Sequence, residues 1–218
     1  SNYEMPKIDH IKKVHGYTKG GSQHVINGTN LGVNVAGSYL EVRFDGEPIA
    51  LDGESTTKII KGDASGSMSG RNEDSITDYI IFILPPMAKV GQEKRLTVHL
   101  GHTLYNVDQD SNEKVFTYGK PRIESIENLE GEPLGLTLSP TTNLIIRGVN
   151  FGFDTYSSIY VDDVMQPLVN NDGVAGVTDW DHRKIVMRYE GIKGNLHVKV
   201  GEIESNIVRF ENKSVELL

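Results

Sequence analysis

The chain has 218 residues, and its net charge is −8 because 30 acidic residues outnumber 22 basic ones. That balance disfavours a nucleic-acid-binding protein, which needs a basic surface to follow phosphates. The sequence has no cysteine, which excludes disulfides, thiolate metal sites and cysteine nucleophiles. No apolar run approaches about 18 residues, so we expect no membrane insertion by this part of the protein.

Helix signals are nearly absent, and short runs rich in Val, Ile, Tyr and Phe recur between clusters of Gly, Asn, Asp and Ser. That pattern is typical of all-β proteins. In the first half we predict strands at residues 7–14, 23–27, 39–44, 57–60, 78–84, 95–100 and 115–118. In the second half we predict strands at residues 122–126, 143–147, 158–162, 184–189, 195–200 and 207–210.

Five short blocks occur twice in the same order, which indicates an internal repeat. The matching blocks are residues 6–11 with 121–126, 26–32 with 146–152, 42–46 with 159–163, 96–101 with 196–201, and 111–116 with 205–210. Each copy holds about seven short strands in roughly 100 residues, the size of an immunoglobulin-like sandwich. We therefore predict two tandem immunoglobulin-like β-sandwiches, residues 1–118 and 119–218.

The repeated blocks also carry a family resemblance. Each copy has a P-x-I-x-x-I opening, then I-x-G-x-N-[LF]-G, then a strand that ends in Asp45-Gly46 in the first copy and Asp162-Asp163 in the second. This order resembles the IPT/TIG family, the immunoglobulin-like domains of plexins, Met-type receptors, NF-κB-type transcription factors and large surface proteins. The resemblance implies modules for ligand recognition, adhesion or spacing.

Four details of the repeat lead to local expectations. The glycines of G-x-N-x-G permit positive φ, and asparagine tolerates the left-handed region, so we expect a turn there. Leu31 and Phe151 follow that asparagine, and we expect each to plug the end of its sandwich. His24 occupies an inward strand position where the second copy has Leu144, so we expect a partly buried histidine bonded to the backbone. Asp163 replaces a turn glycine.

The seven histidines lack the spacing of a metal site. His99 and His197 fall on the outward phase of alternating strands, where ordinary surface histidines are expected. Asp108, Asp110 and Asn112 form the start of a calcium loop, which lacks the later Gly and Glu that such a loop needs. These three residues are the one metal candidate, and turn formation is the alternative for them.

The second copy has carboxylates at Asp162-Asp163 and around Trp180, and we interpret them as solvated loop charges. Trp180 is the only tryptophan. Because tryptophan is enriched at binding hot spots, Trp180 is a candidate protein contact, with packing over a core edge as the alternative. We predict a loop around it.

Four polar segments are candidate contact surfaces, because binding residues often lie on loops held by a rigid scaffold. They are residues 63–74, predicted as a mobile loop, and residues 102–114, 128–140 and 170–181. Asn27 and Asn212 lie in glycosylation sequons. Glycans on either one in native material would exclude an intracellular location.

We therefore expect a non-enzymatic binding, adhesion or spacer module without a cofactor, a two-domain fragment of a larger cell-surface or secreted protein. Its partners would be a protein ligand, neighbouring domains of the same polypeptide or a second copy. One alternative is a scaffold repeat of an intracellular assembly, ciliary or cytoskeletal. Another is a carbohydrate-binding accessory module, which needs exposed aromatic side chains to stack on sugars.

Overall fold

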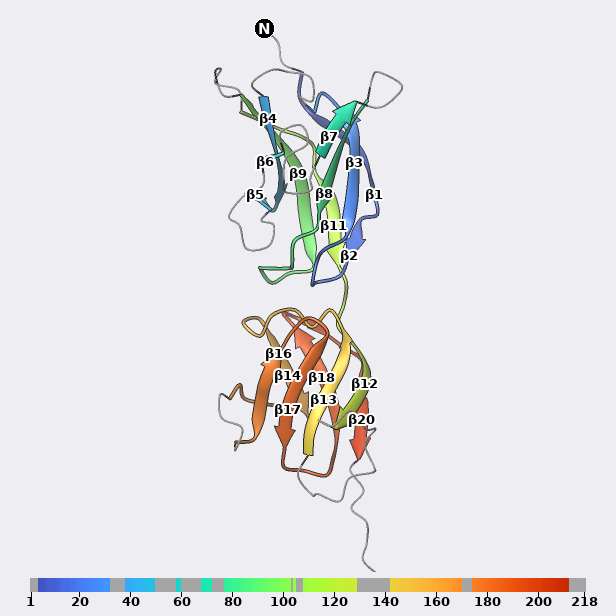
Figure 1. Ribbon diagram of the computed structural model, residues 1–218, viewed down its shortest axis with the longest axis vertical. Helices are drawn as coiled ribbons and strands as arrows, with labels where there is room; N and C mark the ends of the chain where they lie inside the picture. The colour runs from blue at the N-terminus through green and yellow to red at the C-terminus, as the bar shows by residue number, and fades with distance from the viewer. Residues whose placement is uncertain are drawn as a thin grey trace, which may run out of the picture. The chain divides into compact units, whose positions relative to one another are not determined.

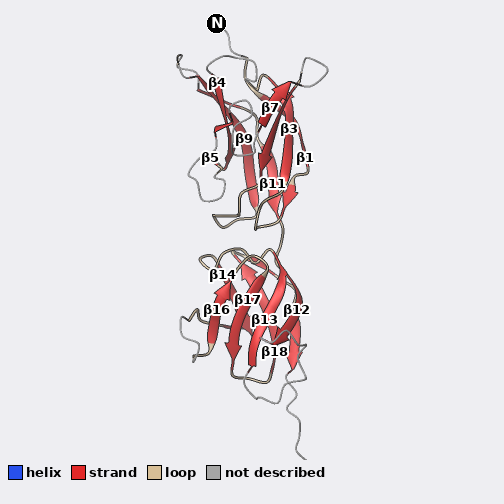
Figure 2. Cartoon of the chain, viewed as in Figure 1, coloured by secondary structure: helices blue, strands red, loops and turns tan. Residues whose placement is uncertain are grey.

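The computed structural model describes residues 4–31, 38–49, 58–59, 68–71, 77–102, 104, 108–128, 142–169 and 174–211. These residues form strands joined by turns, bends and irregular segments, and Figure 2 accordingly shows strands and loops without helix among them. Within this part of the chain, no helix has the length and apolar character to cross a bilayer. Two compact units are present: unit 1 is Ser1–Pro86 with Gln92–Tyr118, and unit 2 is Met87–Gly91 with Gly119–Leu218.

Unit 1 contains two sheets, which form the two layers visible in Figure 1. The first has the order β1 (Lys7–Lys12), β3 (Gln23–Thr29), β8 (Asp78–Ile83), β7 (Met68–Arg71). The second has the order β2 (His15–Gly16), β11 (Lys114–Tyr118), β9 (Glu93–His102), β4 (Ser38–Phe44), β5 (Glu47–Pro48). Two short strands complete it: β10 (Asp108–Asp110) on β9 and β6 (Lys58–Ile59) on β4.

Unit 2 repeats this plan with fewer strands. Its first sheet has the order β12 (Arg122–Asn128), β13 (Thr142–Val149), β17 (Lys184–Tyr189), β16 (Gly176–Trp180). Its second sheet has the order β15 (Val164–Met165), β14 (Ser157–Val161), β18 (Lys193–Val200), β19 (Ile203–Glu204), with β20 (Val208–Glu211) also on β18. The order of the strands is compatible with an immunoglobulin-like sandwich, whose two sheets hold strands A-B-E-D and C-F-G.

The predicted all-β fold class is confirmed, and every predicted strand overlaps an observed one. Two loop predictions were wrong. Residues 68–71 form β7, which pairs with β8 at the edge of its sheet, although they lie in a stretch too polar for a core. Residues 176–180 form β16, which pairs with β17. The rest of residues 63–74 and residues 129–140 lie outside the described part of the chain.

The cores are built from alternating side chains, because successive residues of a strand point to opposite faces. In β9, Leu96, Val98 and Leu100 are buried. Leu31 and Phe151 are fully buried, as expected for side chains that close the ends of the two cores.

The turn motif before each plug works partly as expected. Asn30 and Asn150 have φ of 55° and 61°, in the left-handed region. The first glycine of the motif, however, serves close approach rather than positive φ. A Cβ on Gly28 would collide with the carbonyl oxygen of Lys7 in β1, and Gly148 meets Arg122 in the same way. Glycine there lets the first strand come close where its register shifts by one residue.

A serine–asparagine pair ties the two sheets of unit 1 together. Ser111 lies between β10 and β11, where its N–H donates to Val98 O at 2.9 Å and its Oγ accepts from Val98 N–H at 2.8 Å. The next side chain, Asn112, reaches the opposite sheet. Its Oδ1 accepts from Ile8 N–H at 2.7 Å, and its Nδ2 donates to Ile8 O at 2.9 Å. We call this arrangement the Ser-Asn clip.

Unit 2 contains the same clip, made by the repeated residues. Val198 N–H donates to Ser205 Oγ at 2.8 Å, and Ile123 N–H donates to Asn206 Oδ1 at 2.7 Å. Asn206 Nδ2 donates to Ile123 O at 3.0 Å. In both units the clip satisfies backbone groups of a buried isoleucine beside the register shift of the first strand. Unpaired buried backbone groups are costly, so the clip has a structural role in each unit.

We expect Asn112→Ala to destabilise unit 1 by about 2 kcal/mol, because the buried N–H and C=O of Ile8 lose their partners. Far-UV circular dichroism during denaturation measures this loss. Trp180 fluorescence, which reports unit 2, serves as the internal control and stays unchanged, whereas Asn206→Ala shifts it. Equal stability of the wild type and Asn112→Ala would contradict a structural role for the clip.

His24 is bonded to the backbone as predicted, and it is more deeply buried than expected, with 1% of its surface exposed. Its Nδ1 donates to Lys13 O at 2.9 Å, and its Nε2 lies 2.7 Å from Ser22 Oγ, in position to accept its proton. The imidazole stacks on Phe82 and meets the edge of Phe116, with ring centroids 5.3 and 4.9 Å away. Burial of the ring lowers the pKa of His24 below its ordinary 6.5.

This lowered pKa makes unit 1 sensitive to acid. The unfolded chain binds the proton more tightly than the folded one, so the stability contributed by neutral His24 is complete above about pH 6.5 and is lost as pH falls. We expect His24→Leu, which copies Leu144, to remove that dependence. Below pH 6.5 the free energy of unfolding of wild type should fall faster than that of the variant, by up to about 1.4 kcal/mol per pH unit. The control is His10→Gln, which removes an exposed histidine and should leave the pH dependence of wild type unchanged. If the free energies of unfolding of wild type and His24→Leu fell in parallel below pH 6.5, this account would be refuted.

Candidate functional site

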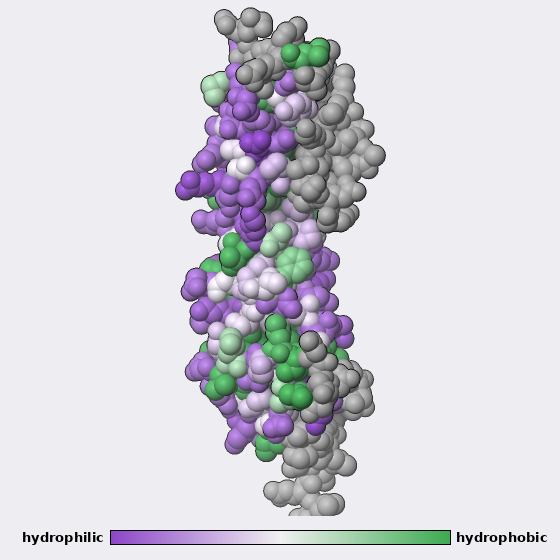
Figure 3. Space-filling view, turned by 90° about the vertical axis from the view of Figure 1, so that its left-hand side faces the viewer, coloured by the Kyte–Doolittle hydropathy of each residue, from purple (hydrophilic) through white to green (hydrophobic). Residues whose placement is uncertain are grey.

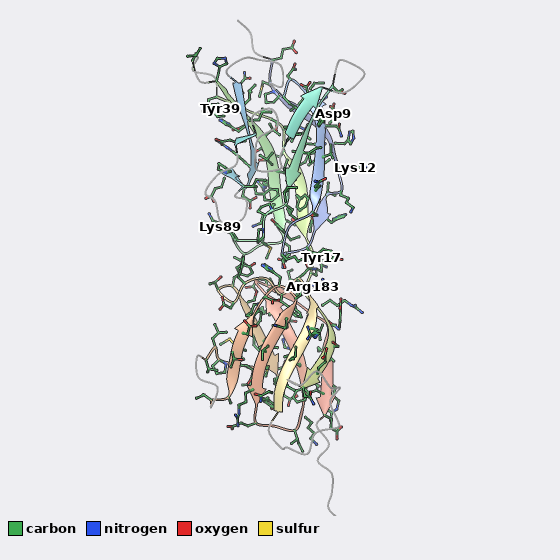
Figure 4. All side chains as sticks on the ribbon, in the orientation of Figure 1. Asp9, Lys12, Tyr17, Tyr39, Lys89 and Arg183 are labelled. Atoms are coloured by element: carbon green, nitrogen blue, oxygen red, sulfur yellow. The ribbon has the colours of Figure 1, made fainter. Side chains whose placement is uncertain are left out.

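On the outer face of the sheet formed by β4, β9 and β10, several charged groups of unit 1 contact one another. Arg95, Thr97 and His99 alternate with the core residues of β9, so they lie on the face away from the core. Figure 3 looks onto the β4 side of unit 1, where the described residues are mostly hydrophilic. Tyr39 of β4 lies on this side, whereas Asp9 and Lys12 of β1 lie on the other (Figure 4).

His99 occupies the centre of this face. Its Nε2 lies 2.6 Å from Asp108 Oδ1, and its Nδ1 lies 2.7 Å from Asp110 Oδ1. The prediction of an ordinary surface histidine was wrong, because His99 is only 6% exposed. Its position in β9 faces away from the core, but Asp108 and Asp110 of β10 contact both nitrogens of its ring, and Glu41 of β4 is its cross-strand neighbour. The same prediction was wrong for His197 of unit 2, which is 8% exposed.

The adjacent strand β4 adds a second pair of charges. The Nε and Nη2 atoms of Arg43 donate to Glu41 Oε2 at 3.0 and 2.8 Å. Arg43 Nη1 also lies 3.9 Å from Asp110 Oδ1, so the two pairs are connected. Glu41 is 7% exposed and paired across the strands with His99. These contacts hold the charged groups of the face in fixed positions.

An open recess of about 490 Å³ lies next to this network. It is lined by two arginines, three carboxylates, two hydroxyl side chains and a glycine: Arg43, Arg95, Asp45, Asp110, Glu113, Thr97, Ser111 and Gly46. The clip explains its position. Ser111 bonds to β9, and Asn112 bonds to the opposite sheet. The chain therefore leaves the edge of β9 between β10 and β11, next to Thr97, and the recess lies at this gap.

The charged groups of the recess differ in whether they have partners. Asp45 Oδ1 accepts from Arg95 N–H at 2.9 Å, and Asp45 Oδ2 lies 4.0 Å from Lys94 Nζ. Among the described residues, neither the guanidinium of Arg95 nor the carboxylate of Glu113 has a hydrogen-bond or ion-pair partner. One unpaired group of each sign is therefore available to a ligand.

The calcium candidates do not converge. Asp108 and Asp110 both point at His99, whereas Asn112 points to Ile8 on the opposite sheet. No group of three His, Cys, Asp or Glu side chains within the described part of the chain is placed to hold a metal ion. The carboxylates thus serve the histidine, and the amide serves the clip.

Trp180 ends β16 and packs against the turn before β14. Its Nε1–H is directed at the carbonyl oxygens of Phe151 and Gly152, at 3.2 and 3.1 Å, and the side chain is half-buried. These bonds give Trp180 a structural role at the core edge; a contact to a partner stays a prediction. Asp181 Oδ1 accepts from the N–H groups of Arg183 and Lys184, both at 2.8 Å, and so forms a turn.

The first sequon lies on a central strand. Asn27 of β3 is half-buried, with its Nδ2 3.3 Å from His10 Nε2. Asn212 lies outside the described residues. Glycosylation of either asparagine stays a prediction.

Of the residues that line the recess, Asp45, Gly46 and Asp110 were noted in the sequence only for a turn and a calcium loop. Arg43, Arg95, Thr97 and Glu113 were not singled out. The signal that could have found them is the repeat itself, because Thr97 and Arg43 stand where the second copy has His197 and Tyr160. The first copy has a small and a charged residue where the second copy has two rings. This difference indicates that the outer surfaces of the two copies differ at this point.

A comparison with protein-family models finds no model that matches the chain, and a comparison with curated proteins finds no match. Function is therefore inferred from the sequence, the fold and the side chains of this chain.

The carboxylates of Asp162 and Asp163 belong to a tight turn between β14 and β15. Their φ values are 48° and 64°, matching Asp45 and Gly46 at 51° and 80° in the turn between β4 and β5. A two-residue hairpin with both φ values positive favours Asn-Gly or Asp-Gly. Asp163 is therefore in a strained conformation that Gly46 adopts freely.

We expect Asp163→Gly to stabilise unit 2 by about 0.5–1 kcal/mol by relieving this strain. The reciprocal Gly46→Asp should destabilise unit 1 by a similar amount, since a Cβ there meets open space and only the backbone changes. Trp180 fluorescence during urea denaturation measures the first change, and circular dichroism measures the second. Changes of the opposite sign would disprove the assignment of strain to Asp163.

Proposed function

We propose that the chain is a non-enzymatic protein-binding module built of two IPT/TIG-like domains, part of a larger cell-surface or secreted protein. The repeated blocks that resemble this family support the domain type, and a strand order compatible with immunoglobulin-like sandwiches agrees with it. Unit 1 contacts the partner through the outer face of β4, β9 and β10.

The recess on that face is the observation that carries the proposal. It is a hollow of about 490 Å³ on a sheet whose charged groups are held by short contacts. A rigid face loses little conformational entropy when a partner binds, so more of the contact energy appears as affinity. Arginine is enriched at protein interfaces, and Arg95 offers an unpaired guanidinium here.

The charges of the recess also favour a protein over a uniformly charged polymer. Two arginines and three carboxylates line the hollow together, so a partner must present groups of both signs at matching positions. Such complementarity gives specificity and orientation more than raw affinity. A second copy of the chain is one partner that meets this requirement.

The test exchanges the two unpaired charges without changing the net charge. The chain carrying Arg95→Glu with Glu113→Lys is compared with wild type and with a matched exchange on unit 2, Lys199→Glu with Glu204→Lys. Each is immobilised and exposed to extracts and secretions of the cells that make the protein, and retained proteins are quantified by mass spectrometry. Sedimentation velocity of each variant tests self-association.

We expect a protein, or a second copy, that wild type and the unit 2 exchange retain and that the unit 1 exchange loses by about tenfold or more. Retention by all three would place the contact elsewhere. No specific retention and a monomer at high concentration would favour a spacer and reject the proposal.

A further inference from the structure

The two units have the same backbone around the recess but different side chains. Thr97 and His197 are equivalent, because each precedes the valine whose N–H donates to the serine of the clip. Each also lies opposite an equivalent residue of the neighbouring strand: Thr97 pairs with Arg43, and His197 pairs with Tyr160. The repeat thus holds two versions of one site.

In unit 2 the site is filled by the protein itself. The ring of His197 lies parallel to the ring of Tyr160, with centroids 4.8 Å apart and planes inclined by 3°. Glu204 Oε1 lies 3.8 Å from His197 Nε2. A flat ring stacked on the neighbouring strand, with a carboxylate at its edge, therefore closes this position.

In unit 1 the same position is open. Thr97 is too small to fill it, Arg43 replaces Tyr160 as the flat group, and Asp110 replaces Glu204 as the carboxylate. Glu113 adds an unpaired carboxylate to the rim. Unit 1 therefore keeps a flat group and a carboxylate around the position of the ring, but none of the residues that line the recess supplies a ring.

We propose that the recess of unit 1 binds one ring-bearing side chain of a partner protein, tyrosine or histidine, in the position that His197 fills in unit 2. The ring stacks on the guanidinium of Arg43, and its O–H or N–H donates to the carboxylate of Asp110 or Glu113. This inference rests on the proposed protein-binding function and names the chemistry of the partner.

The state of Arg43 supports this arrangement. Its guanidinium is held by two hydrogen bonds to Glu41, so its plane is fixed before a ligand arrives. Planar guanidinium groups attract aromatic faces, and a fixed one loses little freedom on binding. A carboxylate at the rim then selects a ring that carries a hydrogen-bond donor, because an apolar ring would leave it without a partner.

The experiment uses single side chains as probes, with the whole chain labelled for NMR. N-acetyl-L-tyrosinamide and N-acetyl-L-histidinamide are titrated to millimolar concentrations, and N-acetyl-L-leucinamide is the control without a ring. We expect the two ring-bearing probes to shift the amide signals of Arg43, Thr97 and Ser111 with millimolar affinity, and the leucine probe to leave them unchanged.

Two reciprocal variants decide where the probe binds. Thr97→His supplies the ring from within and should abolish the shifts, while the remaining spectrum shows that unit 1 is folded. His197→Thr removes the ring from unit 2 and should create new shifts at Tyr160 and Ser205. Either change is made on an outer face, so the core is left intact.

Absence of shifts in wild type, equal shifts with the leucine probe, or full binding by Thr97→His would each overturn the inference. Its failure is distinguishable from failure of the proposed function. Loss of a protein partner on exchanging Arg95 and Glu113, without any probe binding, would retain the function and reject the ring. Probe binding without any protein partner would retain the ring site and reject the proposed protein-binding function.

Discussion

Each sandwich depends on one amide side chain that bonds the backbone of the opposite sheet. Asn112 and Asn206 each accept from and donate to a single isoleucine, at the place where the first strand shifts its register. The register shift leaves backbone groups that the neighbouring strand does not pair, and the amide supplies one acceptor and one donor to match them. Gly28 and Gly148 complete the arrangement, since a side chain there would push the first strand away.

The same constraint shapes the surface. Because the clip residues bond inward, the last strand of each unit is interrupted, and the outer face is left open at that point. The side chains of the neighbouring strands determine whether this opening is filled. In unit 2 the stacked rings of His197 and Tyr160 fill it, whereas in unit 1 small and charged side chains leave it open. Duplication has therefore kept the residues that hold the backbone and varied those that face outward.

The sequence predicts most of the strands, because alternation of apolar residues needs only local information, and the left-handed asparagines follow from residue type. Prediction from the sequence fails where the structure depends on contacts between residues far apart in the chain. The strand alternation predicts an exposed His99, yet two aspartates of β10 contact its ring, and Glu41 of β4 lies opposite it in the sheet. The strand β7 is missed because its polar residues gain their place from pairing with β8. The recess depends on three separate segments, which only the fold brings together.

The parallel pairing of β2 with β11 has a mechanical consequence for unit 1. These strands lie near the two ends of unit 1, and Thr117 N–H donates to Val14 O at 2.8 Å beside their ladder. Tension that pulls the two ends apart along the strands loads these hydrogen bonds in shear, so they bear the load together and must fail together. The clip joins Ile8 of β1 to Asn112 in the turn that leads into β11, so it lies on the same load path. Unit 1 is thereby built to resist extension along its strands.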